Sequence, residues 1–175
     1  MVRHLGPLEL VGDRWVIGDP KRKDGSCVVL TAGGLEHHKR GVPEPLAVVP
    51  WGKFVSVGVR ATHWAWQATR TAGVLDGLGG SHMGAGRSGC SVSGLLRHPY
   101  EGWSVNYTHH ERLYTAAHVT VVADLFKKMS DAKALRRLGD PEWLGAAVDR
   151  LAPLPARWAP SMGRQVNAII EDLGT

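Results

Sequence analysis

From Leu8 to about Trp66, apolar and polar positions alternate with a period of two or form short apolar runs, and turn-forming residues interrupt them every 8 to 12 positions. Two further strand-like segments follow a glycine-rich stretch. This pattern is typical of a meander of antiparallel strands. Gly12-Asp13 and Ala32-Gly33-Gly34 predict tight hairpins, the second through glycines that can take positive φ angles. The segments that carry the pattern are 8–11, 14–17, 27–31, 35–40, 46–49, 53–61, 90–96 and 103–107.

The period changes after residue 110, where apolar residues recur at helical spacing. The expected helices span about 114–129, 131–138, 141–151 and 162–173. We expect Ser130-Asp131 to cap the second helix, Asp140 followed by Pro141 to begin the third, and Ser161 to cap the fourth.

The two patterns together predict an α+β fold, with an antiparallel sheet or a partly open barrel of about seven strands followed by three to four C-terminal helices. At 175 residues the chain has the length of one domain, so we expect a single α+β domain over 1–175. Within it, 1–110 is mainly β with a glycine-rich loop at 77–89, and 111–175 is helical.

Composition places the chain among ordinary globular proteins, because 43% of its residues are hydrophobic and 21% are charged. No apolar run approaches the roughly 20 residues of a membrane-spanning helix, and no secretory signal follows Met1, so we expect a cytoplasmic protein that does not span a membrane. Cys27 and Cys90 lie far apart in strand-like contexts. They are interpreted as buried hydrophobic residues rather than metal ligands or reactive thiols.

Gly84–Gly89 has the spacing GxGxxG of dinucleotide-binding loops. That motif binds phosphate when a strand enters it and a helix leaves it, and neither flank has the required pattern here. A flexible connector is therefore the favoured interpretation of this segment.

Histidine pairs at 37–38 and 109–110 raise the question of a metal or acid–base site. Adjacent residues of a strand point to opposite faces, so each pair could give at most one ligand to a common site, and exposed polar histidines are favoured. His110, Glu111 and His118 could form an acid–base cluster, but no nucleophile accompanies them. We assign no catalytic, metal-binding or cofactor-binding residue and expect no cofactor.

A basic segment lies in the helical part, within a chain of net charge +5. Such a segment could neutralise phosphates, but it lacks interleaved aromatic residues, so a solvated helical face is favoured. Trp64 and Trp66 extend the alternation of the preceding strand and could add a contact surface. The candidate interaction residues are Lys127, Lys128, Lys133, Arg136, Arg137, Trp64 and Trp66.

The stretch from Val28 to Leu35, with its glycine turn, and the strand from Ala47 that closes on Pro50-Trp51 resemble bacterial pleckstrin-homology-like (PH-like) domains. The resemblance implies a bent antiparallel sheet of about seven strands with a helix plugging one end. It also implies partner binding or oligomerisation and no catalytic residues. The glycine-rich loop and the additional C-terminal helices depart from that pattern.

The sequence therefore leads to three functional hypotheses. The first is a non-catalytic protein-interaction or scaffolding module that binds a protein partner or self-associates through sheet edges or the terminal helix. The second is a nucleic-acid-binding accessory protein that uses the basic segment 127–137. The third is a small enzyme that uses histidines and the glycine-rich loop.

Overall fold

The structure is a computed structural model that describes residues 4–23, 25–63, 89–154 and 160–174. Its strands are β1 His4–Leu5, β2 Leu8–Val11, β3 Arg14–Ile17, β4 Ser26–Leu30, β5 Gly34–Lys39, β6 Ala47–Pro50, β7 Phe54–Arg60, β8 Ser91–Leu96 and β9 Glu101–Asn106. Its α-helices are α2 Ala116–Asp131, α3 Pro141–Leu151 and α4 Met162–Asp172, and the short 3₁₀ helices are η1 Trp51–Lys53 and η4 Leu135–Gly139.

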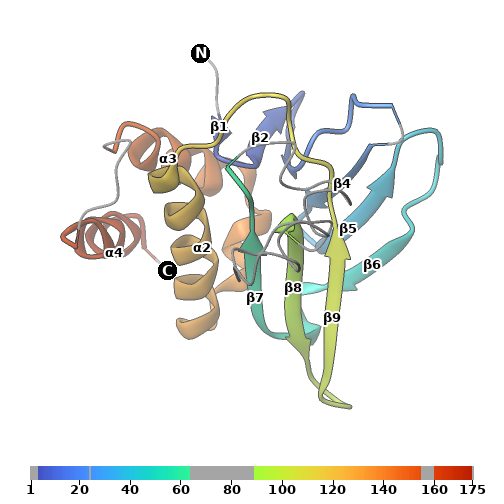
Figure 1. Cartoon of the computed structure of the whole chain (residues 1–175). Helices are drawn as coiled ribbons and strands as arrows, with labels where there is room; N and C mark the ends of the chain where they lie inside the picture. The colour runs from blue at the N-terminus through green and yellow to red at the C-terminus, as the bar shows by residue number, and fades with distance from the viewer. Residues whose placement is uncertain (1–3, 24, 64–88, 155–159, 175) are drawn as a thin grey trace, which may run out of the picture.

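The strands form two antiparallel sheets that follow the order of the chain. Strands β1 to β6 make a six-stranded meander, and β7, β8 and β9 make a separate three-stranded sheet. Figure 1 shows the three-stranded sheet beside helix α2. Most of the larger sheet lies on one side of this pair, and helices α3 and α4 lie on the other. None of the described helices has both the length and the apolar character needed to cross a membrane.

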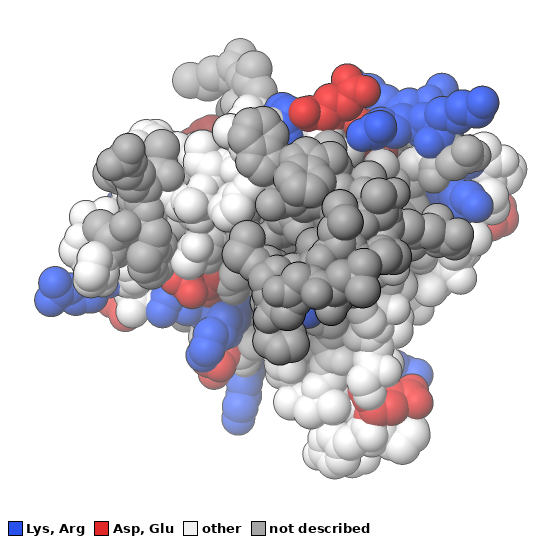
Figure 2. All heavy atoms as spheres, viewed as in Figure 1, with Lys and Arg blue, Asp and Glu red and all other residues white. Residues whose placement is uncertain are grey.

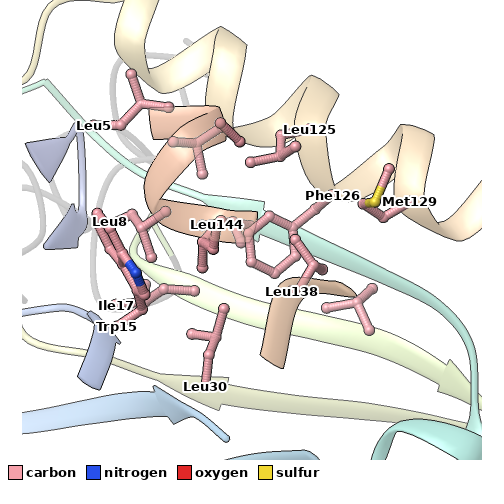
Figure 3. Close-up of a cluster of buried hydrophobic side chains, with 14 of the residues drawn as sticks. Leu5, Leu8, Trp15, Ile17, Leu30, Leu125, Phe126, Met129, Leu138 and Leu144 are labelled. Carbon is pink, nitrogen blue, oxygen red and sulfur yellow. The ribbon is translucent and has the colours of Figure 1, made fainter. Parts of the chain in front are cut away.

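One hydrophobic core joins both sheets to the helices. Trp15, Ile17 and Leu30 point from the first sheet toward Phe126 of α2 and Leu144 of α3, as Figure 3 shows. Each of these side chains is at most about 5% exposed. Burial of one such side chain stabilises the fold by roughly 1.5–3 kcal/mol. The helices are therefore part of the same folded unit as the strands.

Two of the helix starts follow the rules of N-terminal capping. The Asp140 carboxylate accepts hydrogen bonds from the backbone N–H groups of Glu142 and Trp143, with Pro141 in the first turn, as the sequence predicts. The Thr115 hydroxyl accepts a bond from His118 N–H at the start of α2, a cap that the sequence analysis missed.

The prediction of about seven strands is wrong in number and arrangement, because the described residues form nine strands in two separate sheets and no closed barrel. The α+β class, the antiparallel pairing and three α-helices are confirmed. The expected helix over 131–138 is instead a turn followed by the 3₁₀ helix η4. The prediction that Ser130-Asp131 caps a new helix is also wrong, because α2 continues through both residues.

Ser130 has a different role from a helix cap. Its hydroxyl donates to Phe126 O in the preceding turn of α2 and accepts from the backbone N–H of Val57 in β7, with distances of 2.9 and 3.0 Å. These bonds are made by a residue in the last turn of the helix, so they fasten the end of α2 to the edge strand β7.

Candidate functional site

The three-stranded sheet has one face built from small and polar residues. In the register of β7, β8 and β9, Gly58 lies opposite Ser93, which lies opposite Ser104. Alternate positions such as Val59 and Val92 are buried on the other face, toward α2. One face of the sheet therefore carries small side chains, and the other face packs toward α2.

Gly94 allows an aromatic wall to form on the packed face. A Cβ atom at this position would lie 2.5 Å from Ser56 O and 2.9 Å from the Phe54 ring. Because glycine leaves this space open, the Trp103 ring packs edge-on against Phe54 with ring centroids 5.4 Å apart. Trp103 remains partly exposed and forms a side of the adjoining hollow.

A hollow of about 760 Å³ lies between this sheet and the last turns of α2. Three of its lining residues are glycines, so backbone rather than side chains forms much of its floor. The residues that line it are Ser56, Val57, Gly58, Ser93, Gly94, Leu95, Gly102, Trp103, Ser104, Lys127, Ser130 and Asp131.

Strand β9 is an edge of the sheet, and its ladder shows which backbone groups face outward. The N–H of Tyr107 donates to Cys90 O at 3.1 Å, and β9 pairs with β8 without a register shift. Alternate residues of an antiparallel edge strand direct both backbone groups to the neighbouring strand. The odd-numbered residues of β9 therefore bond to β8, and Gly102, Ser104 and Asn106 direct their backbone groups outward.

One end of this edge is closed by Ser26 at the start of β4. Its hydroxyl donates to Asn106 O at 2.9 Å, and its carbonyl accepts from Thr108 N–H at 2.8 Å. Gly102 and Ser104 are exposed, and no backbone group elsewhere in the described chain bonds to them. The open part of the edge, residues 101–105, is about 16 Å long.

The other sheet edges are covered, blunted or very short. Strand β1, at the other edge of the larger sheet, has only two residues. Ser130 occupies the outward N–H of Val57 on β7. The outer strand β6 ends at Pro50, which has no N–H to offer, and follows a turn that contains Pro43 and Pro45. The β9 edge is thus the part of the described sheets best suited to accept a further strand.

A second polar centre is formed by Glu9, His109, His110, Arg112 and Tyr114, which we call the histidine centre. The backbone N–H of His110 donates to the Tyr114 hydroxyl, which lies 2.6 Å from His110 Nδ1. Nε2 of the same imidazole lies 3.3 Å from the Glu9 carboxylate, to which Arg112 donates at 2.6 Å. The ring of His109 stacks on Tyr114, and its Nε2 lies 2.8 Å from Thr62 O.

The surroundings of the histidine centre favour the neutral form of both imidazoles. Burial, and then the nearby Arg112 guanidinium, lower the pKa of His110 to about 4, and burial also lowers the pKa of His109. Burial raises the pKa of Tyr114 and of the neighbouring thiol Cys90, so neither is prepared to lose its proton. These groups do not form an activated nucleophile and base.

The structure corrects the interpretation of the second histidine pair. His109 and His110 are 3% and 6% exposed, not surface residues, because they lie between the sheets and the start of α2. The expected grouping with Glu111 and His118 does not form: Glu111 is exposed, and His118 Nε2 lies 3.0 Å from Ala152 O. The acidic partner is Glu9, which is more than a hundred positions away and gave no local signal.

In the first pair, His37 faces the core and His38 faces the opposite side of the sheet, where it lies 2.9 Å from Glu36. Cys27 and Cys90 are buried and unpaired, as the sequence predicts, and burial raises the pKa of Cys27 to about 11. In the described ranges, no group of three or more His, Cys, Asp or Glu side chains is placed to hold a metal ion.

The candidate basic residues are spread over the end of α2, the following turn and η4. Lys127 is exposed, lines the hollow and forms an ion pair with Asp131 at 2.5 Å. Lys133, Arg136 and Arg137 are exposed, and Lys128 is half-buried. Trp64, Trp66 and the glycines from 77 to 88 lie outside the described residues.

Sequence reasoning missed the β9 edge as a site, although a signal for it was present. Small and polar residues alternate with larger ones along 102–107, and 91–94 contains only one large side chain, Val92; this pattern indicates a sheet face that carries small side chains. Comparison of the chain with protein-family models, with curated proteins and with solved structures gives no match.

Proposed function

We propose that this chain is a non-catalytic protein-interaction module of PH-like type that binds an extended segment of a partner protein as an added strand on β9. The observation that carries the proposal is the exposed edge at Gly102 and Ser104, whose outward backbone groups have no partner within the described chain. Strand addition uses such an edge, with main-chain hydrogen bonds giving affinity.

The hollow beside the edge supplies a basis for specificity. Side chains of an added strand alternate between the two faces of the sheet, so every second one would point to the side of Trp103 and α2. On that side the hollow is lined by Trp103, which offers an aromatic surface, and by Lys127, Ser130 and Asp131 of α2. We therefore expect the partner segment to place an apolar side chain in the hollow.

Two further features support a PH-like, non-catalytic module. The stretch that resembles PH-like domains falls on β4, β5, β6 and η1, and helix α2 is the next element after the last strand and packs on β7. The buried, neutral histidine centre argues against the enzyme hypothesis. Cytoplasmic location remains part of the proposal, and self-association through β9 is the alternative use of the same edge.

The test is selection of peptides from a displayed random library on the wild-type protein, followed by titration of the selected peptides into two variants. Ser104→Pro removes the outward N–H without removing a bond to β8, whereas the matched control Ser104→Thr keeps that N–H. We expect binding to wild type and Ser104→Thr, with at least about a tenfold loss in Ser104→Pro.

Thermal unfolding of both variants checks that each is folded. Selected peptides that bind Ser104→Pro as tightly as wild type would show that β9 is not the site. Failure to select any peptide, together with a dimer in solution that Ser104→Pro dissociates, would assign the edge to self-association instead.

A further inference from the structure

Among the described residues, a second concentration of positive charge lies outside both the open part of the β9 edge and the basic segment 127–137. Two connections at one end of the first sheet, the loop from β3 to β4 and the turn after β5, bring five cations together. Figure 2 shows blue surface gathered at this end of the molecule, at the upper right. We call this surface the basic cluster, and it consists of Lys21, Arg22, Lys23, Lys39 and Arg40.

Backbone and arginine contacts hold the two connections together. Arg40 N–H donates to Gly25 O at 2.8 Å, and the Arg40 guanidinium also donates to Lys21 O. The Arg22 guanidinium donates to His109 O at 3.4 Å. The cluster is therefore set by the fold, and its cations come from segments about 20 positions apart in the sequence.

The three lysines of the cluster are accessible to a partner. Lys21, Lys23 and Lys39 are exposed, and no carboxylate among the described residues forms an ion pair with any member of the cluster. Two acids, Asp19 and Asp24, belong to the same loop, so five cations stand against two carboxylates. The Asp19 carboxylate accepts a bond from Lys21 N–H inside the loop.

We propose that the basic cluster binds the phosphate backbone of a nucleic acid, as a second binding surface independent of the β9 edge. Phosphate contacts require exposed cations in a fixed arrangement and need no groove, which fits a surface made of lysines on two joined connections. An apolar peptide would need a hollow, and the hollow described above lies on the other sheet.

An anionic membrane fits this surface less well. The turn beside the cluster carries exposed Val42 and Leu46, but Glu44 is exposed between them and no aromatic residue is present. A turn that enters the membrane interface would have to bury that carboxylate. A phosphate backbone can contact the lysines without burying the turn.

The test compares two triple variants that remove equal charge. Lys21→Ala, Lys23→Ala and Lys39→Ala empty the cluster while leaving both structural arginines in place. The matched control, Lys127→Ala, Lys128→Ala and Arg137→Ala, removes three cations from the end of α2 and η4. Labelled duplex and single-stranded DNA and RNA are titrated at about 50 and about 200 mM salt, with thermal unfolding as the check of folding.

We expect the wild type and the control to bind, with an affinity that falls steeply with salt. The cluster variant should lose at least about tenfold in affinity, and its slope of log K against log salt should be smaller by about three. Equal losses in both variants would show generic attraction and overturn the proposal. So would the absence of nucleic-acid binding, including the case in which vesicles of anionic lipid bind the cluster instead. Peptide binding by the cluster variant reports separately on the β9 edge.

Discussion

Close approach of backbone, rather than a positive φ angle, explains the glycine at the β4–β5 turn. The sequence predicts a hairpin over Ala32-Gly33-Gly34, and the hairpin is confirmed. Neither glycine has a positive φ angle. A Cβ atom at Gly34 would instead collide with the Val49 carbonyl of β6, whereas Gly33 has only Thr31 Oγ1 at 3.9 Å.

This difference predicts opposite outcomes for neighbouring substitutions. Gly34→Ala should lower the free energy of unfolding by about 1–3 kcal/mol, because β6 must move away from β5. Gly33→Ala is the matched control and should be neutral or slightly stabilising, since it restricts only the unfolded chain. Urea unfolding measures both. Equal destabilisation by the two variants would contradict the close-approach explanation.

Local sequence rules also fail for a residue that bonds across the fold. Ser130-Asp131 has the residue types of a helix cap, which led to the wrong boundary. The Ser130 hydroxyl bonds to Val57 of β7, 73 positions away, and that partner cannot be found from neighbouring residues. By contrast, Asp140-Pro141 caps α3 through purely local bonds, and the sequence placed it correctly.

At the scale of elements, the Ser130 bond fastens α2 to β7. Ser130→Ala should leave Val57 N–H buried without a partner and lower the free energy of unfolding by about 1–3 kcal/mol. Thr120→Ala is the matched control, because the Thr120 hydroxyl also donates to a carbonyl four residues earlier, and this bond stays within α2. It should change stability by no more than about 0.5 kcal/mol.

Comparison of the two unfolding curves decides this point. A Ser130→Ala variant as stable as Thr120→Ala would mean that the bond to Val57 contributes nothing, and that packing of Leu125 and Phe126 alone holds α2 in place.

The fold class and the strands β2 to β9 could be predicted because they depend on local period, whereas the two-residue strand β1 is too short to show one. The division into two sheets and the composition of the histidine centre could not, because they depend on contacts between distant segments. Glu9 meets His110 and Arg112 across about a hundred residues, and Ser26 joins Asn106 across 80. The basic cluster also arises in this way, from lysines and arginines of two connections that are separate in the sequence.

At the scale of the whole molecule, the buried histidines predict acid lability. His110 has a pKa of about 4 in the folded chain, against an ordinary value near 6.5, and burial also lowers the pKa values of His4, His37 and His109. Below about pH 6.5 the unfolded chain therefore binds more protons than the folded chain, so stability falls with falling pH. His110 alone contributes a loss of about 3 kcal/mol between its two pKa values.

Urea unfolding between about pH 7 and pH 4 measures this loss. His110→Gln, which cannot titrate, should be less stable than wild type near neutrality but should show a shallower decline with acidification. An equal decline in both proteins would mean that His110 is not the group that couples protonation to unfolding.

The central claim is that β9 is an open edge that accepts a strand. Amide hydrogen exchange followed by NMR measures this directly, residue by residue. In the free protein the amides of Gly102 and Ser104 should exchange quickly, while those of Trp103 and Val105, bonded to β8, should be protected. On addition of a selected peptide, Gly102 and Ser104 should become protected and the other two should change little. Protection of Gly102 and Ser104 in the free protein, or fast exchange at both in the peptide complex, would contradict the account.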